Sequence, residues 1–194
     1  MPSDPSHLSQ KTRRTFVAIG LGSNIGDSPR TLAGAVERLA EVLDDVRVSP
    51  LYRTAPVGGP RQRDYLNAVV TGTTALAPLP LLALLQRLER EAGRRPSPVR
   101  DAPRPLDLDL LIYGNARIAT PRLTVPHPRL GGRRFVLRPL ADLAPSRVVP
   151  GLRRRVRTLL ALAPDARVRR LGSAGWHRSV PRVPVEQLPP GERQ

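Results

Sequence analysis

Two aspartates, Asp107 and Asp109, stand two residues apart in the otherwise apolar run of residues 104–114. Because alternate side chains of a strand point the same way, both carboxylates would share one face of a strand here. The opposite face would take the apolar side chains Leu106, Leu108, Leu110 and Ile112. Two like charges at the edge of a core raise each other's cost of ionisation, which a cation relieves. The pattern favours one or two Mg²⁺ ions that also bind phosphate oxygens. The alternative is a pair of acids on a solvated face.

A basic, proline-studded stretch, residues 94–105, runs directly into these aspartates. Its prolines exclude a helix or a central strand, so the sequence predicts a long loop. Arginines in such a loop can bind the phosphate oxygens of a ligand while the aspartates bind the metal on the same phosphates. The two charge signs would then serve one ligand.

Tyr65 and Asn67 would share one face of a strand predicted over residues 65–74, directly after a Gly- and Pro-rich loop. An aromatic ring beside an amide suits a flat heterocycle, because the ring stacks and the amide supplies a donor and an acceptor. From the pattern alone, the favoured interpretation is a tyrosine packed at a sheet edge beside a solvated asparagine. His127 lies between two prolines, where a phosphate contact and a structural role are both open.

These residues must be positioned by a mixed set of elements. Strands are predicted over residues 16–20, 46–53, 65–74 and 118–125, and helices from Ser28 onward and over residues 81–92, 136–144 and 156–163. The first strand leads into a glycine-rich turn, residues 21–27, and then a helix, which is a phosphate-binding context. The glycine spacing does not match a dinucleotide fingerprint, and no acid ends the next strand, so a nicotinamide-binding domain is not supported.

The chain of 194 residues contains no Cys and no apolar run of membrane-spanning length. We expect a disordered N-terminal extension over residues 1–15, one folded domain over residues 16–165 and a basic, Pro-rich flexible tail over residues 166–194. The polar N-terminus lacks the apolar segment of a secretory signal, so a cytoplasmic location is expected and no membrane partner.

The formal net charge of +16 invites a nucleic-acid interpretation. Residues 1–15 carry +2 and residues 151–194 carry +7, so more than half of the excess lies outside residues 16–150. Only one basic residue is a lysine, which indicates a base-composition bias. With 3% aromatic residues there is little material for stacking bases, and nucleic acid is not the expected partner.

Together these motifs resemble the 6-hydroxymethyl-7,8-dihydropterin pyrophosphokinase family, in the family's order over about residues 16–150. The residues that carry the resemblance are Gly22-Ser23-Asn24, Tyr52-Arg53-Thr54, Asp64-Tyr65-Leu66-Asn67, Pro103-Arg104-Pro105-Leu106-Asp107-Leu108-Asp109, Leu123-Thr124-Val125-Pro126-His127, Arg133 and Phe135. The resemblance implies an α+β fold, a mainly antiparallel sheet with a ferredoxin-like core and helices packed on it. It also implies an ATP-dependent diphosphokinase of folate biosynthesis. This enzyme would transfer diphosphate from ATP to the pterin hydroxymethyl group and release AMP.

The resemblance further implies roles for individual residues. Asp107 and Asp109 would bind two Mg²⁺ ions. The pterin would be bound by Thr54, Val57, Tyr65, Asn67 and Phe135. ATP would be bound by Gln86, Glu89, Arg94, Arg104, Leu110, Arg122, Thr124, His127 and Arg133. The catalytic set would be Arg94, Arg104, Asp107, Asp109 and Arg133, in a monomer. No residue stands out as a general base, and Asp109 is the nearest candidate.

The chain also departs from the family. Asp101 stands where many members carry a loop tryptophan, Pro96 and Ser97 replace basic residues, and Pro128 replaces a frequent tyrosine. We therefore expect a stiffer loop over residues 94–105 that closes less completely over the site.

Two other classes stay open. A nucleotidyltransferase also combines a Gly-Ser turn with two aspartates, although about eighty residues separate them here. A basic RNA-binding protein would use residues 151–194.

Overall fold

The computed structural model describes residues 14–99, 101–164, 166–172 and 174–180. Nearly all of the predicted disordered extension, residues 1–15, therefore lies outside the described residues. None of the helices in the described ranges is long and apolar enough to cross a membrane.

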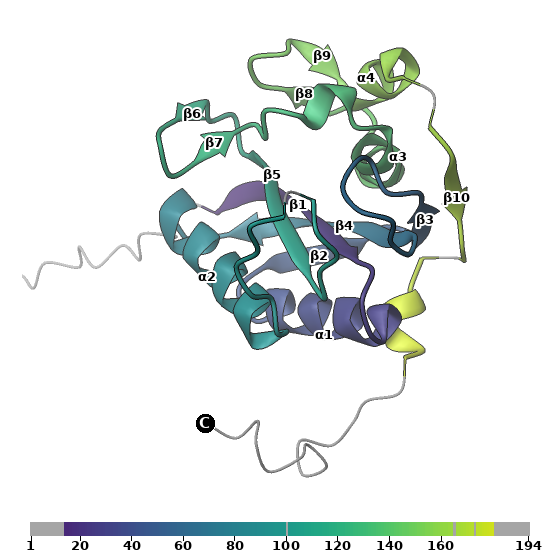
Figure 1. Cartoon of the computed structure of the whole chain (residues 1–194). Coiled ribbons are helices and arrows are strands. Elements are labelled where there is room, and N and C mark those ends of the chain that lie inside the picture. Colours follow the sequence, from purple (N-terminus) through teal and green to yellow (C-terminus); the bar gives the residue numbers. More distant parts are fainter. Residues whose placement is uncertain (1–13, 100, 165, 173, 181–194) are drawn as a thin grey trace, which may run out of the picture.

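An antiparallel sheet of six strands forms the centre of the molecule (Figure 1). Its strands are β1 (Thr15–Ser23), β2 (Asp44–Val48), β3 (Tyr52–Thr54), β4 (Tyr65–Thr74), β5 (Asp107–Tyr113) and β10 (Val168–Arg170). The order across the sheet is β10-β3-β4-β1-β5, and β2 also pairs with β4. Two small hairpins lie apart from this sheet and pair β6 (Ile118–Ala119) with β7 (Thr124–Val125), and β8 (Val148–Val149) with β9 (Arg154–Arg155).

Helices cover both faces of the sheet (Figure 1). The helices are α1 (Ser28–Ala40), α2 (Pro78–Glu91), α3 (Arg134–Leu143) and α4 (Val156–Leu162), with short 3₁₀ turns η1 (Leu130–Gly132) and η2 (Trp176–Arg178). One core cluster joins α1 and α2 to the sheet, with Leu32, Leu39, Leu81 and Leu85 fully buried. The other joins α3 and α4 to the opposite face through Leu137, Leu140 and Leu159.

When the short strand β3 and the edge strand β10 are set aside, the chain order is β1-α1-β2-β4-α2-β5 and the strand order is β5-β1-β4-β2. Both are those of a ferredoxin-like core. The predicted α+β class is therefore confirmed. The helix predicted from Ser28 is present as well, because Asp27 caps it by accepting a hydrogen bond from the Arg30 N–H at 3.1 Å.

Two predicted strands are divided in the structure. The segment 46–53 splits into β2 and β3 at Ser49-Pro50, where the proline has no N–H for a ladder. The Ser49 hydroxyl instead accepts a hydrogen bond from the Val69 N–H at 2.9 Å. The segment 118–125 folds back on itself as the β6–β7 hairpin rather than forming one strand.

A bulge changes the expected facing of β5. Ile19 of β1 pairs with Leu110, but the neighbouring Ala18 pairs with Ile112, so Leu111 is an extra residue. Ile112 consequently packs in the α3–α4 cluster beside Leu111, not with Leu108 and Leu110 as predicted. Asp107 and Asp109 precede the bulge and keep their shared face.

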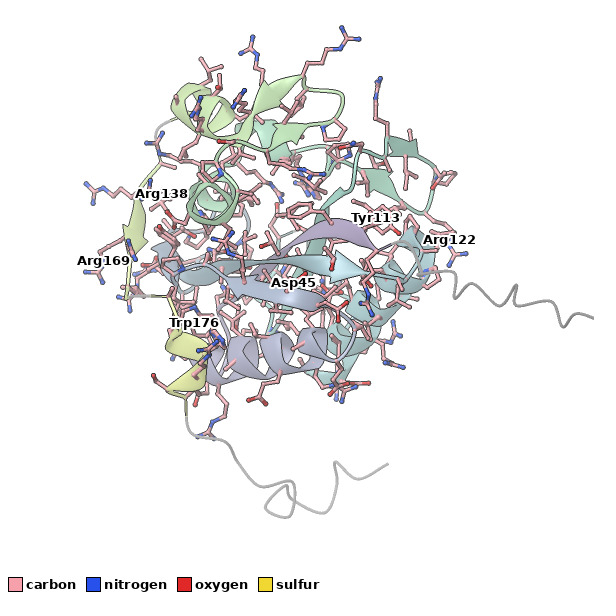
Figure 2. The ribbon with its side chains drawn as sticks, turned by 180° about the vertical axis from the view of Figure 1, so that it is seen from behind. Asp45, Tyr113, Arg122, Arg138, Arg169 and Trp176 are labelled. Carbon is pink, nitrogen blue, oxygen red and sulfur yellow. The ribbon has the colours of Figure 1, made fainter. Side chains whose placement is uncertain are left out.

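The folded unit also extends past the predicted boundary at residue 165. β10 pairs antiparallel with β3, and the Leu171 N–H donates to the Leu51 carbonyl at 2.8 Å. Figure 2 shows Trp176 beside α1, where its indole N–H donates to the Ser49 carbonyl at 3.0 Å. The described residues between 166 and 180 are therefore attached to the sheet and to α1, which corrects the prediction of a flexible tail for this part. Residues 181–194 lie outside the described part of the chain.

Candidate active site

Three adjacent strands, β4, β1 and β5, form the floor of a cavity of about 990 Å³. Gly22 of β1 pairs with Asn67 on one side and with Asp107 on the other. Gly20 pairs likewise with Val69 and Asp109. Directly paired residues project to the same face of a sheet, so the amide and the two acids face the cavity on either side of two glycines.

The missing side chain of Gly22 keeps this floor open. A Cβ atom there would lie 3.2 Å from Asn67 Oδ1 and 3.7 Å from Asp107 Cβ. The glycine of the predicted turn therefore lies inside β1, which runs to Ser23, and lets the neighbouring polar side chains approach the same space.

One end of the cavity carries the aromatic and amide groups predicted to bind the pterin. Tyr65 and Asn67 come from β4, Thr54 from β3, Val57 from the following loop and Phe135 from α3, and all line the cavity. The Asn67 Nδ2 group donates to Thr54 Oγ1 at 2.7 Å. This bond fixes the orientation of the Asn67 amide and places its oxygen beside Gly22.

The other end combines arginines with the aspartate pair. Asp107 Oδ1 accepts hydrogen bonds from Arg94 Nη1 at 2.8 Å and from Arg104 Nη1 at 3.1 Å. Asp109 Oδ2 lies 3.5 Å from Arg133 Nη1 and 3.7 Å from His127 Nε2. Each acid thus faces at least one arginine through one oxygen, and three arginines from two segments, the loop before β5 and the residue before α3, converge on the same surface.

The Glu89 carboxylate connects this cluster to the backbone of β5. Its carboxylate accepts a hydrogen bond from the Leu108 N–H at 2.8 Å and also pairs with Arg94. Burial raises the pKa of Glu89, while the Leu108 N–H and Arg94 act in the opposite direction. The predicted ATP contact is therefore a buried carboxylate that joins α2, β5 and Arg94.

Asp109 and His127 both carry shifted pKa values. Burial, and then the neighbouring charge of Asp107, raises the pKa of Asp109 against the opposing effects of His127 and Arg133. Burial lowers the pKa of His127, although Asp109 acts to raise it. Both shifts indicate that ionising this end of the cavity is costly without a ligand.

The donor set fits magnesium. Within the described ranges no group of three or more His, Cys, Asp and Glu side chains could hold a metal. The protein therefore offers two carboxylates rather than a complete cage, and Mg²⁺ in phosphate-transfer sites uses one or two carboxylates plus water and phosphate oxygens. The raised pKa of Asp109 shows that its negative charge is unfavourable in this site, and a bound cation would relieve that cost.

The structure brings most of the predicted site residues together. Twelve of them line the cavity: Thr54, Val57, Tyr65, Asn67, Gln86, Glu89, Arg94, Arg104, Asp107, Asp109, Arg133 and Phe135. His127 lies outside the lining but contacts Asp109. The Leu110 side chain is 4% exposed in the core, so only its main chain could face a ligand.

Arg122 and Thr124 are two predicted residues that do not line the cavity. Both are exposed at the β6–β7 hairpin and are absent from the cavity lining (Figure 2 labels Arg122).

Sequence reasoning missed two amides at the cavity edge, Gln62 and Asn24. Gln62 lines the cavity, and Asn24 Nδ2 donates to Gln62 Oε1 at 2.8 Å. Asn24 belongs to the Gly22-Ser23-Asn24 motif, which could have indicated it. Gln62 has no local signal, because two of its three partners, Asn24 and Asp101, come from distant parts of the chain.

Comparisons with known proteins assign the chain to one family. The profile of a family described as "7,8-dihydro-6-hydroxymethylpterin-pyrophosphokinase (HPPK)" matches residues 18–145. A 2-amino-4-hydroxy-6-hydroxymethyldihydropteridine pyrophosphokinase of Pseudomonas aeruginosa is 44% identical over 168 residues, which cover 84% of this chain and 99% of that protein. The mitochondrial folate synthesis bifunctional protein of Arabidopsis thaliana is 46% identical over 133 residues, which cover 68% of this chain and 24% of that protein.

Among solved structures, a Plasmodium falciparum HPPK-DHPS chain superposes with a TM-score of 0.62 at 15% identity, covering 79% of this chain and 46% of that one. At this identity the likeness shows the fold alone. This chain spans about a quarter of the Arabidopsis protein and less than half of the Plasmodium chain.

Proposed function

Because this chain belongs to the 7,8-dihydro-6-hydroxymethylpterin-pyrophosphokinase family, we propose that it transfers diphosphate from ATP to 6-hydroxymethyl-7,8-dihydropterin. The products are AMP and the pterin diphosphate, a step of tetrahydrofolate biosynthesis. The protein acts as a monomer in the cytoplasm, with no membrane or nucleic-acid partner.

One observation carries this proposal: the Tyr65–Asn67 pair of β4 and an arginine-aspartate cluster at β5 line the same cavity, two strands apart. Adjacent strands are about 4.8 Å apart, so the strand positions of Asn67 and Asp107 are roughly 10 Å apart. A bicyclic ring whose far edge bonds the Asn67 amide would direct its hydroxymethyl group towards the acids. The aromatic rings of Tyr65 and Phe135 support stacking of that ring.

The reaction is in-line attack of the hydroxymethyl oxygen on the β-phosphorus of ATP, with AMP as the leaving group. Most of the catalysis comes from positioning and from stabilising charge on the transferred oxygens. Arg94, Arg104 and Arg133 supply fixed positive charge at the end of the cavity where the acids lie. Asp109 is the nearest group that could accept the hydroxyl proton.

Asp107 and Asp109 are proposed to hold two Mg²⁺ ions. When bound, these ions neutralise phosphate charge and polarise the phosphoryl oxygens. Arg94 and Arg104, which both donate to Asp107 Oδ1, would then turn to the phosphates, because both interactions use the same guanidinium donors.

The remaining residues proposed to contact the nucleotide differ in whether they line the cavity. Gln86, Glu89 and the three arginines line the cavity and can contact the nucleotide directly or position those that do. His127 would act next to Asp109, and Leu110 through its main chain only. Arg122 and Thr124 could contact only a part of ATP that extends beyond the cavity.

The test is to incubate the protein with Mg²⁺, ATP and 6-hydroxymethyl-7,8-dihydropterin and to separate the products. We expect AMP and pterin diphosphate in equal amounts, and neither product without Mg²⁺. Release of pyrophosphate would instead indicate a nucleotidyltransferase. RNA affinity that falls with salt, in the absence of AMP, would indicate an RNA-binding protein.

A further inference from the structure

Arg129 is a further arginine of the cavity wall, and its side chain has no acidic partner. The other three arginines beside the acids each face an aspartate oxygen. Among the described residues, by contrast, the Arg129 guanidinium makes no hydrogen bond or ion pair. Its main-chain N–H donates to His127 Nδ1 at 3.2 Å. The side chain is exposed and is therefore available to a ligand.

The backbone on both sides of Arg129 is fixed. The His127 N–H donates at 3.0 Å to the carbonyl of Leu111, the bulge residue of β5. The Leu130 N–H donates to the His127 carbonyl at 2.9 Å, and the Leu130 side chain is fully buried in the α3–α4 cluster. Arg129 therefore extends from a defined point between β5 and α3.

Arg129 lies where two cavities meet. It lines the cavity of about 990 Å³ and also a second cavity of about 530 Å³. Every other residue that lines the second cavity belongs to residues 86–105, which are the end of α2 and the arginine-bearing loop. Arg129 thus faces this loop from the opposite wall. A ligand that extends from the acids towards the loop would lie beside it.

The charges of the main cavity show what Arg129 contributes. Five arginines and four acids line this cavity, so its formal charge would be zero without Arg129. Arg129 also opposes a second cation, since burial is the largest cause that lowers the pKa of Arg133 and the charge of Arg129 is the next. Two neighbouring cations are stabilised by an anion that binds both of them.

We propose that Arg129 binds the polyphosphate of ATP from the wall opposite residues 94–104. Its guanidinium donates to phosphate oxygens beside Asp109, together with that of Arg133. The inference rests on the proposed function, because the ligand is the nucleotide substrate of that reaction. Arg129 gives up no ion pair when the nucleotide enters, whereas Arg94 and Arg104 must first leave Asp107.

The chemistry of the guanidinium favours the polyphosphate over the base or the ribose. Its planar fork matches phosphate oxygens in both geometry and charge, whereas the base and the ribose are uncharged. ATP and inorganic triphosphate share the polyphosphate. AMP keeps the base and the ribose but has a single phosphate. A polyphosphate contact therefore predicts which of these three ligands loses affinity when Arg129 is changed.

Isothermal titration calorimetry of the full chain with ATP, inorganic triphosphate and AMP, each with Mg²⁺, tests this contact. Arg129→Gln removes the charge and the fork, and Arg129→Lys keeps the charge but not the fork. The matched control is Arg117→Gln, which removes the same charge from an exposed arginine that lines neither cavity.

We expect Arg129→Gln to weaken the binding of ATP and of inorganic triphosphate by roughly tenfold to a hundredfold, as for the loss of hydrogen bonds between charged groups. The binding of AMP should weaken much less. Arg129→Lys should recover part of the loss. Pterin affinity and the melting temperature should not change, because the Arg129 side chain is exposed and holds no other residue. Arg117→Gln should bind all three ligands as the unaltered protein does.

Calorimetry needs no turnover, so it separates this proposal from the proposed function. An unaltered protein that binds ATP and triphosphate but forms no AMP would reject the proposed reaction alone. Normal triphosphate affinity in Arg129→Gln would overturn the polyphosphate contact, and a loss confined to ATP and AMP would place Arg129 at the base or the ribose instead. Equal losses in Arg129→Gln and Arg117→Gln would also overturn it, since net charge alone would then explain them.

Discussion

Asp109 is the residue at which burial and function conflict most directly. Burial and the Asp107 charge raise its pKa, while His127 and Arg133 partly compensate. If Asp109 served stability only, its uncharged isostere Asn could replace it without loss of turnover. If Asp109 binds a cation, the same replacement lowers turnover.

Replacing Asp109 by Asn tests this difference. We expect the turnover number to fall by about two orders of magnitude or more, with pterin affinity largely retained, since the pterin amide lies two strands away. The resistance to urea unfolding should not decrease, because the substitution removes a charge that burial disfavours. AMP formation, pterin titration and urea unfolding measure the three quantities, and near-normal turnover would reject the metal assignment.

Gly22 makes a second residue-level prediction. A methyl group at this position would meet Asn67 Oδ1 at 3.2 Å, so the amide must shift by a few tenths of an ångström. Gly22→Ala should therefore raise the pterin KM about tenfold, the cost of roughly one disturbed hydrogen bond, with a smaller effect on the ATP KM.

Steady-state kinetics with each substrate varied in turn measure this difference. Gly34→Ala on α1 is the matched control, because nothing lies within 4 Å of its added carbon. It should leave both KM values unchanged and stabilise the helix by about 1 kcal/mol. Equal effects of Gly22→Ala on both substrates would contradict the assignment of this floor to the pterin.

At the scale of elements, the C-terminal segment is an unexpected part of the sheet. β10 extends the edge at β3, the strand that carries Thr54, and η2 ends on α1. Trp176 anchors this segment with its indole bonded to Ser49 and its ring packed against the first core cluster. The segment therefore supports the strand next to Asn67.

Trp176→Ala should lower the free energy of unfolding by about 3 kcal/mol, the low end for a large aromatic because the ring is only partly buried. Trp176→Phe keeps most of the packing and loses the hydrogen bond, so about 1 kcal/mol is expected. Urea titration followed by circular dichroism measures both. Equal stability of the alanine variant and the unaltered protein would show that the segment is not part of the cooperative unit.

The elements predicted correctly from the sequence are those with strong local signals. Apolar periodicity and caps located β1, α1, β4, α2, β5 and α3, and period-two alternation placed Asp107 and Asp109 on one face. Most of the site residues that the resemblance then named line the cavity.

The features that were missed depend on partners distant in the chain. The sequence of β10 was predicted as a basic tail, because its pairing with β3 has no local signature. The bulge at Leu111 is set by the register of β5 with β1. The Asn24–Gln62 contact likewise joins residues 38 apart. Such pairings follow from tertiary packing, which local patterns do not encode.

At the scale of the whole molecule, the positive charge is segregated. Residues 114–164 carry eleven arginines and one acid, whereas residues 15–109 carry twelve arginines and eleven acids. Residues 114–164 form the hairpins, α3 and α4, which cover one face of the sheet in Figure 1. A base-composition bias exchanges lysine for arginine but does not remove acids from one segment of a chain. The cavity opens between this basic layer and the sheet, with Arg133 and Phe135 on its wall.

Such a layer should attract a nucleoside triphosphate over distances of about a Debye length, roughly 10 Å at 0.1 M salt. Changing the exposed residues Arg153, Arg154 and Arg155 to Gln should slow association of a fluorescent ATP analogue several-fold at low salt and flatten its ionic-strength dependence, with kcat unchanged. Changing Arg30, Arg38 and Arg87 to Gln on α1 and α2 removes the same net charge from the other layer and should have a smaller effect. Stopped-flow measurements between low and physiological salt compare the two variants. Equal slowing in both would mean that net charge alone governs the rate, and that the segregation of arginines has no part in capturing the nucleotide.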